Sequence, residues 1–227
     1  MASMREVLNT AFDGQYLFGG MNSGVAPIKD YAAGPRGAIE TSFAAEFGFP
    51  PDDPTASSLT PQQIQSFLNG SFNNLFEDPA WSTDWSSASN DMPKTRIGDE
   101  KIDAAASGNA PFARKMAAAF AMIDVLGRGQ LGRATLETAI DMSLAKVAES
   151  QADIGAEQAR VGAGESRLAA TAAGLDERKT RFASSIQELE GVDSYEAATR
   201  VNMLMSQLEA SYALTARISR MSLLSYI

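Results

Sequence analysis

Apolar residues recur at every seventh position through the second half of the chain. The series, named here the rod seam, consists of Ile140, Val147, Ile154, Val161, Leu168, Leu175, Phe182 and Leu189. A period of seven keeps one face of a helix against its partners only if the helices wrap slightly around each other. We therefore expect one long helix over residues 133–190, roughly 85 Å in length. A rod of this kind favours an architectural role over a catalytic one.

The position four residues beyond each seam residue is less apolar. It is occupied in turn by Leu144, Gln151, Gln158, Glu165, Ala172, Lys179 and Ile186. Such a half-apolar seam cannot bury a large area in a simple dimer, which favours asymmetric packing against other helices. A solvated helix face accounts for the polar residues equally well.

A second helix of different character follows the rod. Gly191 ends the rod, and Asp193 with Glu196 resembles a capping box that starts a helix continuing to residue 227. Its apolar face, named here the axial stripe, consists of Val201, Leu204, Leu208, Tyr212, Ile218, Met221, Leu224 and Ile227. Apolar groups at a free terminus fray unless something covers them, so we expect the axial stripe to bind a partner.

The first half of the chain predicts shorter elements. We expect the end of a helix over residues 4–11, a turn at 13–14, an extended segment at 16–18 and a helix over 38–47. Thr60 and Gln63 predict a capping box with Pro61 at the first helical position. Residues 95–97 and 101–105 predict a β-hairpin. The apolar and aromatic residues between 72 and 85 are expected to seal a small α+β subdomain.

A helix capped by Asn109 is predicted after the hairpin. Its apolar positions form another seam, made of Phe112, Met116, Ala119, Ile123 and Leu126. Residues 127–132 then carry three glycines at the spacing of a dinucleotide-binding loop. That motif needs a preceding strand, and here a helix precedes it, so we interpret the segment as a hinge between helices.

Composition excludes several classes of protein. The chain has 227 residues, 44% of them hydrophobic, and a net charge of −9, which suits one elongated domain or two small ones and argues against nucleic-acid binding. It contains no Cys and no His, which removes thiolate nucleophiles, disulfides, Cys/His zinc sites and His-based triads. We expect no cofactor, no metal site and no membrane insertion, and the N-terminus lacks a secretory signal pattern.

Two other functions stay open at this point. Trp81 and Trp85 suit an aromatic shelf for a glycan, which would make the chain a surface glycan-binding protein. The carboxylates of Asp52, Asp53, Asp84 and Asp91 are the candidates for a pair of catalytic acids. General acid chemistry needs a shielded pair, whereas carboxylates in polar loops are usually solvated.

The end of the chain resembles a known family. Residues 192–201 (VDSYEAATRV) and 210–224 (ASYALTARISRMSLL) are similar to the C-terminal helix of bacterial flagellins. Residues 13–20 (DGQYLFGG) are similar to the segment that follows the N-terminal core helices in the same family. Within the family the resemblance is greatest to the hook-associated proteins that join hook and filament, with filament flagellin as the alternative.

This resemblance implies a fold, a location and partners. The fold is mainly α, an elongated coiled-coil-like helical rod with a small α+β insert subdomain. The implied divisions are a remnant of the N-terminal core helix at 1–14, an outer α+β subdomain at 15–105, the rod at 106–190 and the axial assembly helix at 191–227. The implied protein is a structural subunit, not an enzyme, exported to the flagellum without a cleavable signal. Its implied partners are itself, hook-associated proteins, flagellin and an export chaperone.

Overall fold

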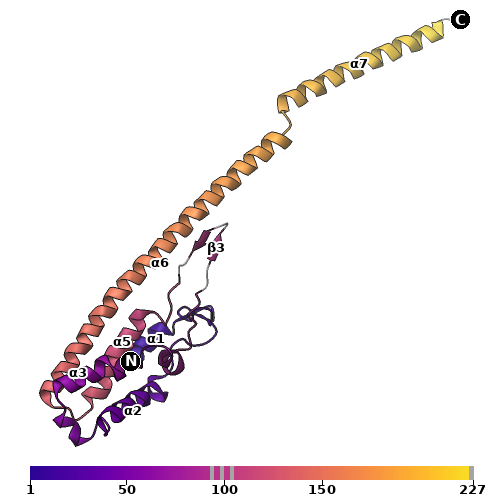
Figure 1. The fold of residues 1–227 in the computed structure, drawn as a ribbon. Coiled ribbons are helices and arrows are strands. Elements are labelled where there is room, and N and C mark those ends of the chain that lie inside the picture. The colour runs from indigo at the N-terminus through magenta and orange to yellow at the C-terminus, as the bar shows by residue number, and fades with distance from the viewer. Residues whose placement is uncertain (93–94, 98–99, 103–104, 225–227) are drawn as a thin grey trace. The chain divides into compact units, whose positions relative to one another are not determined.

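The chain is mainly α-helical, as the sequence predicts. The computed structural model describes residues 1–92, 95–97, 100–102 and 105–224, and the side chains of 1–92 and 105–221. The chain divides into two compact units, Met1–Thr171 and Ala172–Ile227. The division falls within one long helix (Figure 1).

The longer of the two long helices has its predicted limits, and the other begins where predicted, while its predicted end at residue 227 lies outside the described residues. Helix α6 spans Arg133–Glu190, 58 residues, which confirms the helix that the rod seam predicts. Helix α7 spans Ser194–Leu224. The Asp193 carboxylate accepts a hydrogen bond from the backbone N–H of Tyr195 at 2.8 Å, so Asp193 caps α7 as expected.

The first unit begins with a short helix and a tight hairpin. Helix α1 spans Ala2–Leu8, and strands β1 (Ala11–Phe12) and β2 (Gln15–Tyr16) pair antiparallel. Asp13 and Gly14 form the connecting turn with φ values of 51° and 76°. Two consecutive positive φ angles are typical of a type I′ turn, in which Asp-Gly is a favoured pair. The predicted turn at 13–14 is therefore confirmed.

Short helices follow and enclose an aromatic core. They are η1 Tyr31–Ala33, α2 Pro35–Phe47, η2 Pro54–Ser58, α3 Pro61–Asn69, α4 Ser71–Asn74 and the π-helical turn η3 Trp81–Trp85. Both bonds of the predicted capping box are present, because Thr60 and Gln63 each accept the other's backbone N–H. Phe76 lies between Phe72 and Trp85, with ring centroids 5.0 and 4.8 Å away. All three rings are buried, which confirms the expected aromatic core.

The predicted β-hairpin is present with a shifted second strand. Strand β3 spans Thr95–Ile97 and pairs antiparallel with β4, Glu100–Ile102. The prediction placed Glu100 in the turn and started the second strand one residue later, which is wrong, because Glu100 pairs with Ile97. Residues 103–104, which the prediction included in that strand, lie outside the described residues.

Helix α5 spans Pro111–Gly127, and its predicted cap is wrong. Ala110, not Asn109, occupies the cap position, and no side chain caps the helix. Pro111 has no N–H that needs a partner at the first helical position, so a side-chain cap is less necessary there. The Asn109 side chain is buried instead, where its Oδ1 accepts a 2.9 Å hydrogen bond from Trp81 Nε1.

The seam predicted for α5 is correct only in part. Ala119 and Leu126 are buried as expected, but Ile123 is exposed. The buried face also includes Ala113, Ala117, Ala118, Ala121, Met122 and Val125. Because α5 contacts both the subdomain and α6, small side chains are needed on more than one face, and these carry little apolar signal in the sequence.

The glycine-rich segment at 127–132 joins α5 to α6. Its backbone contacts the loop before η2, where Gln130 N donates to Pro51 O at 3.0 Å. A Cβ at Gly129 would lie 2.7 Å from the same oxygen, so this close approach needs glycine. The segment follows a helix, which agrees with the predicted connection between helices and not with a dinucleotide-binding loop.

Candidate assembly surfaces

The face of α6 that packs inside the first unit is not the rod seam. It consists of small residues, namely Thr135, Ala139, Ser143, Ser150 and Gly164. Ser143 Oγ donates to Ala119 O at 3.0 Å, and Ser150 Oγ donates to Phe112 O at 2.8 Å. Small side chains allow the two helices to approach closely, and these hydrogen bonds fix their register. None of these five residues belongs to the rod seam.

The rod seam itself is incompletely covered by this chain. Val147, Ile154 and Val161 are half-buried, and Leu168 is 38% exposed. The remaining seam residues are all exposed, and they are Ile140, Leu175, Phe182 and Leu189. Unpaired large apolar side chains in a regular row are typical of a surface that binds another helix. That the seam contacts other subunits stays a prediction.

An apolar groove in the first unit brings residues of both predicted seams together. This groove, named here the α5–α6 groove, has a volume of about 300 Å³ beside α1. It is lined by Ser3, Met4, Val7, Leu8, Phe112, Ala113, Met116, Phe120 and Ile154. Met116 and Ile154, from the predicted seams of α5 and α6, therefore border one open groove. A groove with apolar walls on three helices suits an additional amphipathic helix.

A second cavity next to this groove carries charge. Its volume is about 870 Å³, and it is bordered by Phe120, Val147 and Leu144 together with charged residues of α5 and α2. Arg128 Nη2 lies 2.5 Å from Asp124 Oδ1, which neutralises the partly buried carboxylate. Burial raises the pKa of the neighbouring Tyr31 hydroxyl above its ordinary value, and the Asp124 charge adds to this effect. The Tyr31 hydroxyl is therefore neutral at physiological pH.

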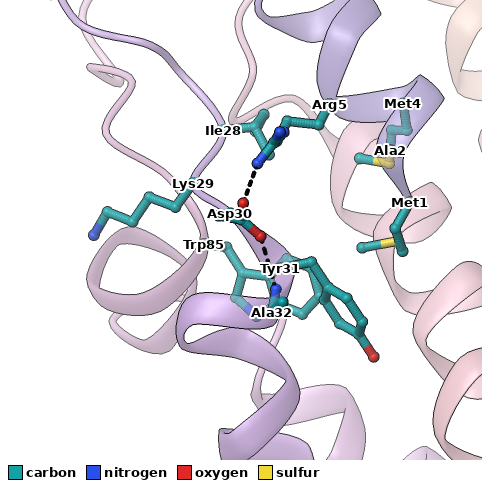
Figure 2. A pocket seen from close by; sticks show the side chains of 10 residues that line it. All are labelled: Met1, Ala2, Met4, Arg5, Ile28, Lys29, Asp30, Tyr31, Ala32 and Trp85. Carbon is teal, nitrogen blue, oxygen red and sulfur yellow. Dashed lines mark hydrogen bonds and ion pairs between the residues drawn. The ribbon is translucent and has the colours of Figure 1, made fainter.

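Polar contacts hold α1 in place as one wall of the groove. Arg5 forms an ion pair with Asp30, and Asp30 also accepts a 2.9 Å hydrogen bond from Ala32 N. The hydrogen bond from Ala32 N, followed by the contact with Arg5, holds the pKa of the Asp30 carboxyl below its ordinary value. A cavity of about 300 Å³ lies at this point. Figure 2 shows the side chains that line it, with Asp30 between Arg5 and Ala32. Asn9 further secures the end of α1 through two hydrogen bonds to the Ile28 backbone.

The axial stripe is exposed along α7. Val201, Leu204, Leu208, Tyr212, Ile218 and Met221 are all more than half exposed. The side chain of Leu224 and the whole of Ile227 lie outside the described residues. A helix that exposes this many large apolar residues along most of its length has the pattern of an interaction surface. The role of the axial stripe in assembly stays a prediction.

The residues considered for glycan binding do not form a surface site. Trp81 and Trp85 are both buried, and their rings stack on each other with centroids 5.6 Å apart. Arg114 covers the Trp81 ring, with its guanidinium carbon 5.4 Å from the ring centroid. A sugar cannot stack on either indole in this arrangement, so the predicted aromatic shelf is wrong. The rings contribute to the core of the subdomain instead.

The candidate catalytic carboxylates lack a shielded environment. Asp52 and Asp91 are exposed, and Asp84 is partly exposed. Asp53 accepts a 2.8 Å hydrogen bond from Thr55 N, and its hydrogen bonds to Thr55 lower the pKa of the carboxyl. A general acid needs a raised pKa, so the shift at Asp53 is in the opposite direction.

The described residues contain no group of three or more acidic side chains arranged to hold a metal ion. Among the helices in the described ranges, none combines the length and the apolar character that crossing a membrane requires.

Comparison with known proteins gives one match. Residues 138–227 match the family model of the bacterial flagellin C-terminal helical region. The chain matches no curated protein and no solved structure. The matched range covers most of α6 and all of α7, and it contains every residue of the rod seam and the axial stripe. The match agrees with the resemblance of residues 192–201 and 210–224 to the C-terminal helix of bacterial flagellins.

Proposed function

We propose that this chain, which carries the C-terminal helical region of the bacterial flagellins, is a structural subunit at the junction between flagellar hook and filament. The observation that carries the proposal is the coincidence of the flagellin match with α6 and α7. The same residues expose five of the eight rod seam residues and the six described residues of the axial stripe. We infer that the subunit polymerises through these two surfaces, with other copies and with other flagellar axial proteins.

The energetics support assembly through the axial stripe. Leu204 and Leu208 expose 57% and 56% of their surface, and full burial of such a side chain is worth about 1.5–3 kcal/mol. Burying the exposed half of each on assembly is therefore worth roughly 1 kcal/mol per residue. Six stripe residues with comparable exposure make α7 a strong candidate for the principal assembly element.

The ending of the sequence supports the junction over the filament. Tyr212 and the final residues Ser225, Tyr226 and Ile227 resemble the ending of the hook-associated proteins more than that of a flagellin. A filament flagellin is the second candidate, because the family match fits either kind of subunit. We further propose an extracellular location in the flagellum, export without a cleavable signal, and an export chaperone that covers the axial stripe beforehand.

Immunogold labelling of intact flagella separates the two candidates. A junction protein places the label at a single point between hook and filament, whereas a filament flagellin places it along the whole filament. Label along the filament would refute the junction assignment and leave the flagellin candidate.

Complementation tests the assembly role of α7. In a strain that lacks the native gene, the full chain should restore filaments, and a chain without residues 219–227 should leave hooks bare. The truncated chain should still fold through most of α6, because it retains every rod seam residue. It should therefore still be found in the medium. Measuring the exported protein separates a failure of assembly from a failure of export. Filaments of normal length on the truncated strain would contradict the proposal.

A further inference from the structure

Helix α7 carries most of the exposed methionine side chains of the chain. The sequence contains ten Met and no Cys, so thioethers are its only sulfur groups. Among the described side chains, those of Met21, Met203, Met205 and Met221 are exposed, and the last three lie in α7. An exposed thioether is open to oxidants from solution, whereas Met122 of α5, which is 1% exposed, is shielded from them. Oxidation of α7 is therefore expected at its methionines.

Met205 shares the face of α7 that carries the first part of the axial stripe. Val201 is four residues before it and Leu208 is three residues after it, and these spacings place the three side chains on one side of the helix. The Met205 side chain is 62% exposed, close to the 56% of Leu208. Met203 is 59% exposed, but two residues correspond to about 200° around a helix, so it lies on the other side. The two methionines therefore share access to an oxidant and differ in their position relative to the stripe.

Oxidation would change the chemistry of this face at a single atom. The sulfur lone pair attacks one oxygen of hydrogen peroxide, so that an S–O bond forms while the O–O bond breaks. The leaving hydroxide takes the proton from the transferred oxygen and departs as water. The sulfur loses two electrons, the peroxide gains them, and the apolar thioether becomes a polar sulfoxide. A polar oxygen buried in an apolar contact without a hydrogen-bond donor costs free energy, so the product weakens a contact that buries this side chain.

We propose that Met205 is an oxidation site that controls assembly through the axial stripe, with a peroxide as the oxidant. A free subunit that carries the sulfoxide at position 205 adds to the assembly less readily. In an assembled subunit the stripe is covered, so the Met205 sulfur is protected. Methionine sulfoxide reductases, which take their electrons from thiols, reverse the change. The inference rests on the proposed assembly role of α7.

Mass spectrometry of the native chain tests the reactivity. In the dilute monomer, hydrogen peroxide should convert Met205 and Met203 to sulfoxides at comparable rates and should oxidise Met122 much more slowly. After the full chain is assembled in sulfate, which strengthens apolar burial, oxidation of Met205 should be slower than in the monomer. Equal rates for Met205 and Met122 in the monomer, or for Met205 in monomer and assembly, would overturn the proposal.

The critical concentration for assembly tests the effect of the oxidation. The substitutions Met21→Leu, Met203→Leu and Met221→Leu keep the apolar character and leave Met205 as the exposed methionine among the described side chains. Peroxide should raise the critical concentration of this chain about tenfold, as expected for one buried polar group without a partner. Treatment with methionine sulfoxide reductases for both sulfoxide epimers should then restore the original value.

The matched control carries Met205→Leu in addition to the three leucine substitutions. Peroxide should change its critical concentration by less than about twofold, because leucine has no sulfur to oxidise. Circular dichroism verifies that both chains fold. The same change in both chains, or no rise in the chain that keeps Met205, would overturn the proposal.

A pair of polar substitutions tests the same position without an oxidant. Met205→Gln places an uncharged polar group on the stripe side of α7 and should raise the critical concentration about tenfold. Met203→Gln makes the same chemical change on the other side of the helix and should leave the critical concentration within about twofold. Equal effects of the two substitutions would contradict the special position of Met205.

This inference and the proposed function fail in different ways. If Leu208→Asp assembles like the native chain, the axial stripe is not the assembly surface, and the proposed function fails. If Leu208→Asp fails to assemble while the peroxide-treated chain that keeps Met205 assembles at its original critical concentration, only the oxidation site is wrong.

Discussion

Replacement of Asn109 by alanine should destabilise the first unit through loss of a buried polar network. The Asn109 side chain joins two segments, because Oδ1 accepts from Trp81 Nε1 and Ser86 Oγ, while Nδ2 donates to Ala88 O and Asn90 Oδ1. After the substitution the Trp81 indole N–H, which is fully buried, has lost its acceptor. A buried donor left unsatisfied costs about 1–3 kcal/mol.

The remaining losses at Asn109 are smaller. Ser86 Oγ retains its hydrogen bond to Pro27 O, so its share of the cost is low. The Ala88 carbonyl loses its Asn109 donor, which adds about 1 kcal/mol. We therefore expect Asn109→Ala to lower the free energy of unfolding by roughly 2–4 kcal/mol.

Urea denaturation followed by tryptophan fluorescence measures this loss, because both tryptophans of the chain lie in or beside the network. Asn90→Ala is the matched control, since Asn90 is exposed and loses a single bond to Asn109. The control should cost less than about 1 kcal/mol. An Asn109→Ala variant no less stable than the control would refute the assigned role of the network.

Two further predictions concern the rod and pH. Leu168→Asp should lower the free energy of unfolding of the monomer by less than about 1 kcal/mol, since Leu168 faces solvent in part. Ser150→Leu should lower it by about 1–3 kcal/mol, because the larger side chain overpacks the contact with α5. Thermal melts by circular dichroism compare them, and a larger loss at Leu168 would contradict the assigned packing face. The raised pKa of Tyr31 means that the unfolded state releases its phenolic proton first, so stability should fall as the pH rises above the ordinary value of 10.0. Above this pH, the free energy of unfolding of Tyr31→Phe should fall less steeply than that of the native chain. Equal slopes for the two proteins would contradict the raised pKa of Tyr31.

The sequence predicts the long helices well, for a physical reason. Sustained periodicity over eight seam positions leaves little choice of element between Arg133 and Glu190, and Gly191 with Asp193 marks the boundary by local chemistry. The capping box at Thr60 and the Asp13 turn are equally local, and both are present. These features depend on residues within a few positions of each other, which a sequence shows directly.

The packing face of α6 was not predictable in the same way. Helix contact inside the first unit uses Ser143 and Ser150, whose hydroxyls bond to backbone carbonyls of α5, and such residues carry no apolar signal. The sequence predicts a local cap at Asn109 because it does not reveal the actual partner, the Trp81 indole, which is 28 positions away. The sequence leaves a glycan-binding role open for Trp81 for the same reason, since the burial of its ring depends on tertiary contacts. The seven-residue repeat of apolar positions therefore indicates a surface that other helices can bind, and not the internal core of this chain.

The most direct test of the central claim compares two single substitutions in α7. Leu208→Asp places a charge on the axial stripe, and Ser206→Asp places the same charge two residues away, on the opposite face of the helix. Each variant is expressed in the strain that lacks the native gene, and filaments per cell are counted by electron microscopy. We predict bare hooks with Leu208→Asp and normal filaments with Ser206→Asp. Normal filaments with Leu208→Asp, or equal loss with both, would contradict assembly through the axial stripe.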